Sequence, residues 1–207
     1  MLADTDFMFR QAKLGAEVFM QAQPFPHLFL PSFIKAPCCN ALYEGLKAEE
    51  LAADSMPSVV RMLLWELSSS TLIRHFTALT GKAPLLPDPF LLHSGPTSFT
   101  SKDVVHTAER EFFARHPQTQ LQNVLRMELF VFSETNATFN IDLINKQGRV
   151  AVTHVGTNGS VLFVNSDDYH LHYRFEQPAL WRSLMAYYYI NDHARILHGE
   201  EQPRATY

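Results

Sequence analysis

Two histidines and an arginine near the C-terminal end of the sequence could hold a metal ion and an organic acid. His170 and His172 follow the apolar run at residues 160–164, and Arg182 opens a β-prone run that contains three consecutive tyrosines. A neutral imidazole is a good ligand for iron, zinc or copper, and a guanidinium is a rigid fork for a carboxylate. The pattern indicates two strands joined by a loop, and a site for a metal-chelating organic acid. The simpler interpretation is a surface histidine and an arginine at the start of a strand.

The composition limits the classes of protein to consider. The 207 residues suit one domain with a sizeable core, and 46% hydrophobic against 18% charged residues indicates a globular chain rather than a disordered one. A net charge of −4 without a long basic run argues against nucleic-acid binding. Adjacent Cys38 and Cys39 are poorly spaced for a disulfide, which favours a reducing, cytoplasmic setting. Without a charged leader or a long apolar run, no membrane partner is expected.

The elements that would position these residues begin with helices. Helical spacing of apolar residues predicts three helices, over residues 5–20, 37–53 and 58–80. A short strand at 27–31 is expected at an edge or an end, because it closes with a proline. Ser55 or Ser58 is the expected cap of the third helix, which can bend at 68–70, and Gly81 suits a left-handed residue after its end.

The second part of the sequence is mostly β. Alternating apolar residues and turn signals predict strands, over residues 90–93, 124–132, 138–144, 149–155, 160–164 and 184–190. Residues 103–109 could be the end of a strand. Helices followed by short strands indicate an α+β chain, with a sandwich or barrel backed by helices. We expect one domain, with helical support at 1–82, a barrel core at 83–192 and a tail at 193–207.

The sequence also resembles the iron(II)- and 2-oxoglutarate-dependent oxygenases, in particular their prolyl-hydroxylase-like branch. The matching pieces follow the family's order and lie at residues 24–33, 79–82, 87–89, 92–96, 116–117, 161–163, 169–170 and 182–189. The resemblance implies a double-stranded β-helix, which is a squashed jelly-roll or cupin-like barrel, backed by N-terminal helices. This agrees with the order of elements expected above.

The resemblance also implies an iron site and a cofactor site. The family holds iron(II) with a histidine, a carboxylate two residues later and a distal histidine. 2-Oxoglutarate then chelates the iron, and a basic residue grips its far carboxylate. Carried onto this sequence, the first metal ligand is His106, the distal ligand is His170 with His172 as the second choice, and the cofactor grip is Arg182.

The sequence departs from the family's pattern at the second metal ligand. Position 108 is an alanine where the family has Asp or Glu. If the alignment is anchored instead on the His-Pro pair at 116–117, then Arg110 and Phe112 stand at the ligand positions. The glycine pair that usually precedes the next strand is also absent.

Three hypotheses follow for the function. A nearby carboxylate, from Glu109 or Glu111, could complete the site for hydroxylation. Alternatively, Ala108 opens an iron position to chloride, as in the halogenases that the sequence His-Thr-Ala resembles. In the third, the fold remains without iron chemistry, and the protein is a non-catalytic binding or partner subunit. An enzyme would act on a small molecule or a peptidyl or carrier-bound substrate. A homodimer and a heteromer both stay open, and mid-strand His154 is interpreted as structural.

Overall fold

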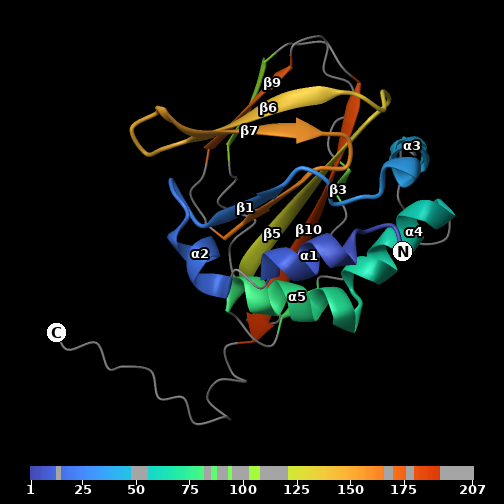
Figure 1. The fold of residues 1–207 in the computed structure, drawn as a ribbon, viewed down its shortest axis with the longest axis horizontal. Helices are drawn as coiled ribbons and strands as arrows, with labels where there is room; N and C mark the ends of the chain where they lie inside the picture. Colours follow the sequence, from blue (N-terminus) through green and yellow to red (C-terminus); the bar gives the residue numbers. More distant parts are fainter. Residues whose placement is uncertain are drawn as a thin grey trace.

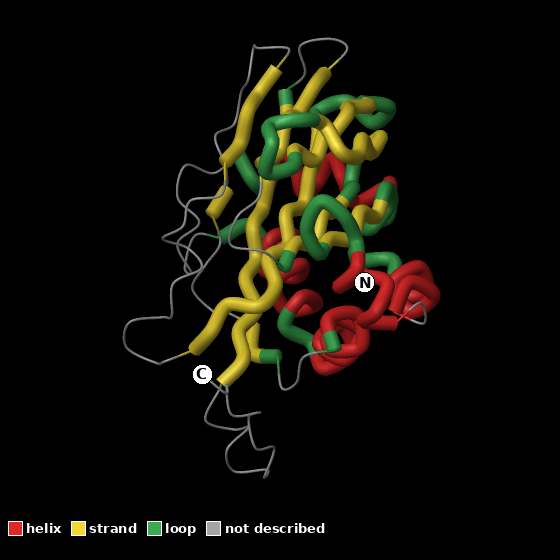
Figure 2. The backbone as a smooth tube through the Cα atoms, turned by 90° about the vertical axis from the view of Figure 1, so that its left-hand side faces the viewer, coloured by secondary structure: helices red, strands yellow, loops and turns green. Residues whose placement is uncertain are grey.

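The computed structural model describes residues 1–12, 15–47, 56–81, 85–87, 93–94, 103–107, 121–165, 170–175 and 180–191. These residues form three layers: a four-stranded sheet, a six-stranded sheet and a layer of helices (Figure 1). Figure 2 shows the helices gathered on one side of the strands. The expected tail at 193–207 lies outside the described residues.

The described helices are α1 (Thr5–Ala12), α2 (Gly15–Gln21), α3 (Ala36–Gly45), α4 (Ser58–Leu67) and α5 (Ser70–Thr80). The helix expected over 58–80 is therefore two helices, divided where a bend was predicted. Ser69 begins the second of them, because its side chain accepts a hydrogen bond from the Leu72 amide. Gly81 ends it in the left-handed conformation, with φ of 66°, as predicted. The expected serine cap of the first helix was wrong, since Pro57 stands at that position without a side-chain cap.

The described strands are β1 (His27–Leu30), β2 (Leu86–Pro87), β3 (His93–Ser94), β4 (Asp103–Thr107), β5 (Leu121–Phe132), β6 (Thr138–Ile144), β7 (Val150–Thr157), β8 (Val161–Val164), β9 (His170–Phe175) and β10 (Trp181–Asn191). The six-stranded sheet has the order β1-β8-β5-β10-β2, with β3 also paired to β10. The four-stranded sheet has the order β4-β9-β6-β7. All pairs are antiparallel, and from β3 onward the chain passes repeatedly between the two sheets.

The segment with the two histidines differs from the prediction. It was expected to be a loop between two strands, but its residues 170–175 form β9, hydrogen-bonded between β4 and β6. Polar and apolar residues alternate here as His-Leu-His-Tyr-Arg, which is the pattern of a strand with one buried face. The two histidines therefore lie on an inner strand of the four-stranded sheet and not in a loop.

Two apolar cores lie on the two faces of the six-stranded sheet. Along β5, Leu129 and Val131 pack against the helices in what we call the helix-side core. Phe130 and Phe132, which alternate with them, pack against the four-stranded sheet in the inter-sheet core. Phe76 of α5 joins the helix-side core. None of the described helices is long and apolar enough to cross a lipid bilayer.

Candidate functional site between the two sheets

The two predicted metal ligands lie on neighbouring strands. β4 carries His106 and β9 carries His170, and the strands pair antiparallel. Their register sets His106 opposite Leu171, and His170 opposite Thr107. The two histidines are thus one step apart along the ladder and not directly opposed. The side chains of both, and all of residues 108–120, lie outside the described part of the chain, so their role in metal binding stays a prediction.

β9 turns two apolar residues toward the space between the sheets. Leu171 and Tyr173 are 0% and 1% exposed and belong to the inter-sheet core. His172, the second choice for the distal ligand, lies between them in sequence and contacts Asp142 instead. Because successive side chains of a strand alternate between its faces, His172 lies on the outer face of the four-stranded sheet.

Arg182, the predicted grip for a carboxylate, lies on the opposite face of its strand from the inter-sheet core. It pairs with Val131 of the helix-side core, whereas its neighbour Trp181 pairs with Phe132 and packs between the sheets. The Trp181 ring lies 5.6 Å from the Tyr173 ring, measured between centroids. The Nε atom of Arg182 is buried and has no hydrogen-bond partner among the described residues, so this guanidinium retains capacity to bind an acid.

A buried charge cluster lies between the sheets and was not predicted. Arg126 Nη2 donates to Glu128 Oε2 at 3.0 Å, and the Tyr173 hydroxyl donates to the same oxygen at 3.0 Å. Arg126 and Glu128 are two residues apart on β5, which places both on the face that carries Phe130. Burial, followed by the negative charge of Glu128, raises the pKa of Tyr173 well above its usual value. Two charges in the otherwise apolar stretch 124–132 were the available signal in the sequence.

A second cluster lies on the outer face of the four-stranded sheet. Asp142 accepts hydrogen bonds from Arg174 Nε at 2.6 Å, Arg174 Nη2 at 2.9 Å and the Thr153 hydroxyl at 2.6 Å. These contacts join β9, β6 and β7, because the three residues lie on three neighbouring strands. The hydrogen bond from Arg174 is the largest cause of the lowered pKa of Asp142. The cluster satisfies its own charges, so we interpret it as structural.

Cys39 packs in the helix-side core. Cys39 is 1% exposed, and both cysteines are free. Burial raises the pKa of the Cys39 thiol to about 11, with a smaller contribution from Cys38. The thiol is therefore protonated and unreactive at neutral pH.

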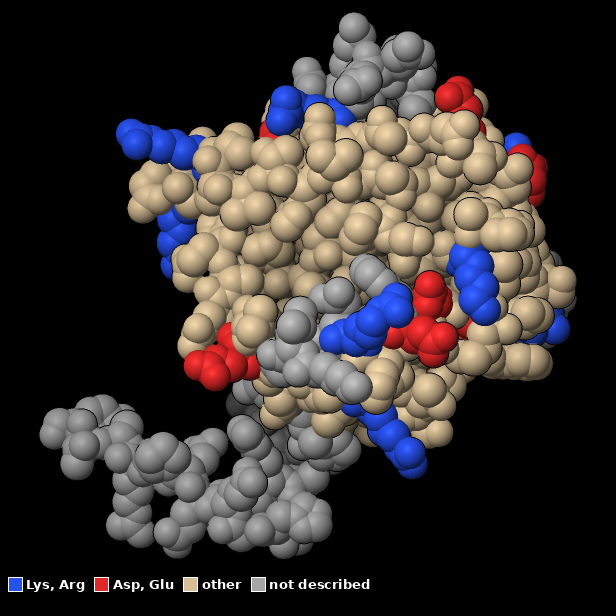
Figure 3. Space-filling model, in the orientation of Figure 1, with Lys and Arg blue, Asp and Glu red and all other residues tan. Residues whose placement is uncertain are grey.

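Part of the space between the sheets is filled by apolar and aromatic side chains. The described inward positions of β9 are Leu171 and Tyr173, and the inward position at the start of β10 is Trp181. Within the described ranges, no group of three or more His, Cys, Asp or Glu residues could hold a metal ion. On the face seen in Figure 3, which has the orientation of Figure 1, charged side chains lie at the margins and in the lower middle, and the upper centre is mostly uncharged.

Comparison with known proteins agrees with this architecture. No protein-family model matches the sequence, and no curated protein sequence matches it. A prolyl-4-hydroxylase from Pseudomonas putida superposes with a TM-score of 0.53 at 10% identity, over 88% of this chain and 92% of that one. A prolyl 4-hydroxylase from Phytophthora capsici gives a TM-score of 0.51 at 13% identity, over 100% of this chain and 71% of that one. The resemblance to the prolyl-hydroxylase-like branch is thus confirmed at the level of the fold.

Proposed function

We propose that the chain is an oxygenase-fold protein that acts as a non-catalytic binding or partner subunit. The observation that carries this proposal is the filling of the inter-sheet space by Leu171, Tyr173 and Trp181. In the family that the sequence resembles, this space is where the double-stranded β-helix holds iron and 2-oxoglutarate. None of these three side chains is a histidine or a carboxylate, the ligands that a non-haem iron site uses, and the Tyr173 hydroxyl already donates to Glu128.

The buried charges between the sheets support the same proposal. The Glu128 carboxylate is occupied by Arg126 and Tyr173, and all three are at most 4% exposed. Removing one partner of a buried ion pair costs about 3–5 kcal/mol. Glu128 is therefore held in this pair and not available as a metal ligand, and Arg126 is already engaged by a carboxylate of the chain itself.

An iron(II)- and 2-oxoglutarate-dependent oxygenase is the second candidate, and the fold favours it, because the chain superposes on two prolyl 4-hydroxylases over most of its length. Such an enzyme would hydroxylate, or with Ala108 halogenate, a small molecule or a carrier-bound substrate. When bound, the iron would supply oxygen activation.

Anaerobic loading with iron(II), followed by metal analysis and calorimetry with 2-oxoglutarate, separates the two candidates. The non-catalytic proposal expects negligible and equal iron uptake by the wild type and His106→Ala. Stoichiometric iron in the wild type that is lost in His106→Ala would overturn it.

The enzyme candidate also predicts how strongly 2-oxoglutarate binding depends on Arg182. If Arg182 grips the far carboxylate, Arg182→Ala should weaken 2-oxoglutarate binding by roughly two to three orders of magnitude, since a lost buried charge partner costs about 3–5 kcal/mol. Arg149→Ala, at an exposed arginine in the turn before β7, is the matched control. For a halogenase, Ala108→Asp should change the product from chlorinated to hydroxylated.

A further inference from the structure

Two histidines meet where the free edges of the two sheets come together. His27 lies on β1, the edge strand of the six-stranded sheet, and His154 lies on β7, the edge strand of the four-stranded sheet. Their Nε2 atoms are 3.1 Å apart, and Figure 1 shows the two strands side by side. The pair is 127 residues apart in sequence. It therefore links two sheets that share no backbone hydrogen bond at this edge.

The contact of His27 Nδ1 with a backbone carbonyl determines which ring nitrogen of His27 carries the hydrogen. Nδ1 of His27 lies 2.9 Å from the carbonyl oxygen of Phe25. A carbonyl oxygen can only accept, so Nδ1 carries the hydrogen and the neutral ring presents the Nε2 lone pair toward His154. A backbone carbonyl that fixes the tautomer in this way is the usual support of a metal-binding histidine.

The surroundings keep both rings in place and uncharged at neutral pH. The Phe29 ring stacks on His154 with 4.9 Å between centroids, and the Phe25 ring meets His27 edge-on at 5.7 Å. Burial lowers the pKa of His27, and it lowers the pKa of His154 to about 4, with a smaller effect of the neighbouring His27. Neutral imidazole is the form that binds metals.

We propose that His27 and His154 form a two-histidine site for a borderline divalent cation of the Zn²⁺ type, which bridges the two sheets. Imidazole nitrogens bind Zn²⁺ at about 2.0–2.1 Å, so two of them on one tetrahedral ion lie about 3.3 Å apart. The present separation of 3.1 Å needs only a small widening. The Nε2 proton shared by the pair moves to Nδ1 of His154 through solvent as the metal binds.

The coordination sphere would stay open on one side. Within the described part of the chain no third His, Cys, Asp or Glu joins the pair, and His154 is only half-buried. Water therefore fills the remaining positions, as it does in zinc sites with an open position. This site is independent of the non-catalytic proposal above, because it involves neither His106 nor His170.

The test is a titration of tag-free protein with ZnCl2 alone, followed by calorimetry and by long-range ¹H–¹⁵N spectra of the histidine rings. We expect one equivalent of Zn²⁺ to bind, to raise the melting temperature and to shift the Nε2 resonances of His27 and His154. His27→Gln and His154→Gln should each abolish the one-site binding, whereas His75→Gln on α5 should leave it intact.

Each other outcome overturns the site. If the Nε2 resonances of His27 and His154 do not move in the wild type, the pair is only a hydrogen bond. This measurement uses the wild type alone, so it does not depend on whether a variant folds. If the glutamine variants bind Zn²⁺ as the wild type does, the ion binds elsewhere. The iron experiments can succeed or fail without affecting either result, since they report on His106.

Discussion

Tyr173 connects the two sheets by a single hydroxyl group. It donates to Glu128 across the inter-sheet core, while the equally buried Tyr188 donates to the backbone carbonyl of Leu67 at 3.3 Å on the helix side. A hydrogen bond to a charged acceptor contributes about 1.5–3 kcal/mol, against about 0.5–1.5 kcal/mol for a neutral one. The two tyrosines therefore provide a matched comparison of a charged and a neutral partner.

We expect Tyr173→Phe to lower the free energy of unfolding by about 1.5–3 kcal/mol. The reason is that Glu128 stays buried with one donor fewer. Tyr188→Phe, which removes the same atom from the other core, should cost less. Urea denaturation of the two variants measures both values, and equal losses would argue that the charge on Glu128 does not strengthen its bond to Tyr173.

Asp142 should give the protein a pH-dependent stability. Its pKa in the folded chain lies below the usual value, chiefly because Arg174 donates to it. The unfolded chain then binds the proton more readily than the folded chain. The resulting stabilisation is fully present above the unfolded pKa of about 3.9 and is lost as pH falls through the folded pKa.

Asp142→Asn is therefore expected to destabilise the protein by about 1.5–3 kcal/mol at pH 7. The difference between variant and wild type should shrink below about pH 4. Urea denaturation at pH 7, 5 and 3 measures it. A difference that stays constant over this range would show that the carboxylate charge contributes nothing.

At the scale of residues, the sequence could suggest which residues are candidates for a site, but not on which face of a strand each one lies. His170 and Arg182 were selected for their chemistry, yet the face that a strand residue presents depends on register, and a one-residue change reverses it. Trp181 and not Arg182 is directed between the sheets for this reason. The partnership of His27 with His154 was equally out of reach, because it depends on the meeting of two sheet edges.

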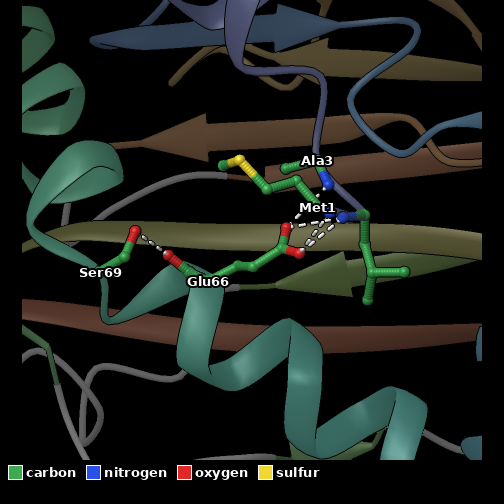
Figure 4. A network of polar contacts seen from close by, with 5 residues as sticks. Met1, Ala3, Glu66 and Ser69 are labelled. Atoms are coloured by element: carbon green, nitrogen blue, oxygen red, sulfur yellow. Dashed lines mark hydrogen bonds and ion pairs between the residues drawn. The ribbon is translucent and has the colours of Figure 1, made fainter.

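Among the elements, α4 holds the N-terminal segment through one carboxylate. Glu66 accepts hydrogen bonds from the Leu2 amide at 2.6 and 2.8 Å and from the Ala3 amide at 3.0 Å (Figure 4). Its backbone carbonyl accepts from the Ser69 hydroxyl, at the junction with α5. Leu2 and Ala3 are buried, so the carboxylate compensates amides that water cannot reach.

Glu66→Ala should cost about 1–3 kcal/mol of stability, because it leaves buried amides without an acceptor. Glu44→Ala is the control, since Glu44 pairs with Lys47 at the surface and such pairs contribute about 0–1 kcal/mol. Hydrogen exchange should show faster exchange of the Leu2 and Ala3 amides in Glu66→Ala only. Unchanged exchange there would contradict the role of Glu66.

The sequence predicted elements well where one physical signal dominated. Gly81 predicted the end of α5, and the serines at 68–70 predicted a bend where α4 and α5 divide. Alternation predicted β6, and a continuous apolar run predicted β8. β9 was missed because the segment contains two histidines and an arginine, which suggest a polar turn until the neighbouring strands are known. The helix expected over 5–20 is α1 and α2, two separate helices.

For the whole molecule, the central pair β5 and β10 belongs to both cores. Leu184 and Tyr188 of β10 face the helices, while Trp181 packs between the sheets. Phe76 of α5 reaches this pair directly, since its ring lies 4.9 Å from that of Tyr188. Because each core packs on one face of the same strands, we expect a loss of packing in one core to disturb the other.

The two tryptophans allow this coupling to be measured. Trp65 on α4 is 69% exposed, so Trp65→Phe should change stability by no more than about 0.5 kcal/mol. Trp181, 4% exposed, then becomes the only fluorescent tryptophan and reports on the inter-sheet core. Far-UV circular dichroism at the helix band reports on the five described helices, all of which lie outside that core.

We expect the two signals of Trp65→Phe to follow a single urea transition with the same midpoint, as a two-state unit requires. Adding Phe130→Ala, which empties part of the inter-sheet core, should lower stability by about 3–5 kcal/mol. The urea midpoint of the helix signal should fall by the same amount as the midpoint of the tryptophan signal. This is expected although Phe130 belongs to the inter-sheet core and not to the helix-side core. Fluorescence that changes at lower urea than the helix signal would instead mean that the four-stranded sheet opens by itself. In that case the shared strands would not couple the cores, and the inter-sheet space would be accessible to a partner without unfolding of the helices.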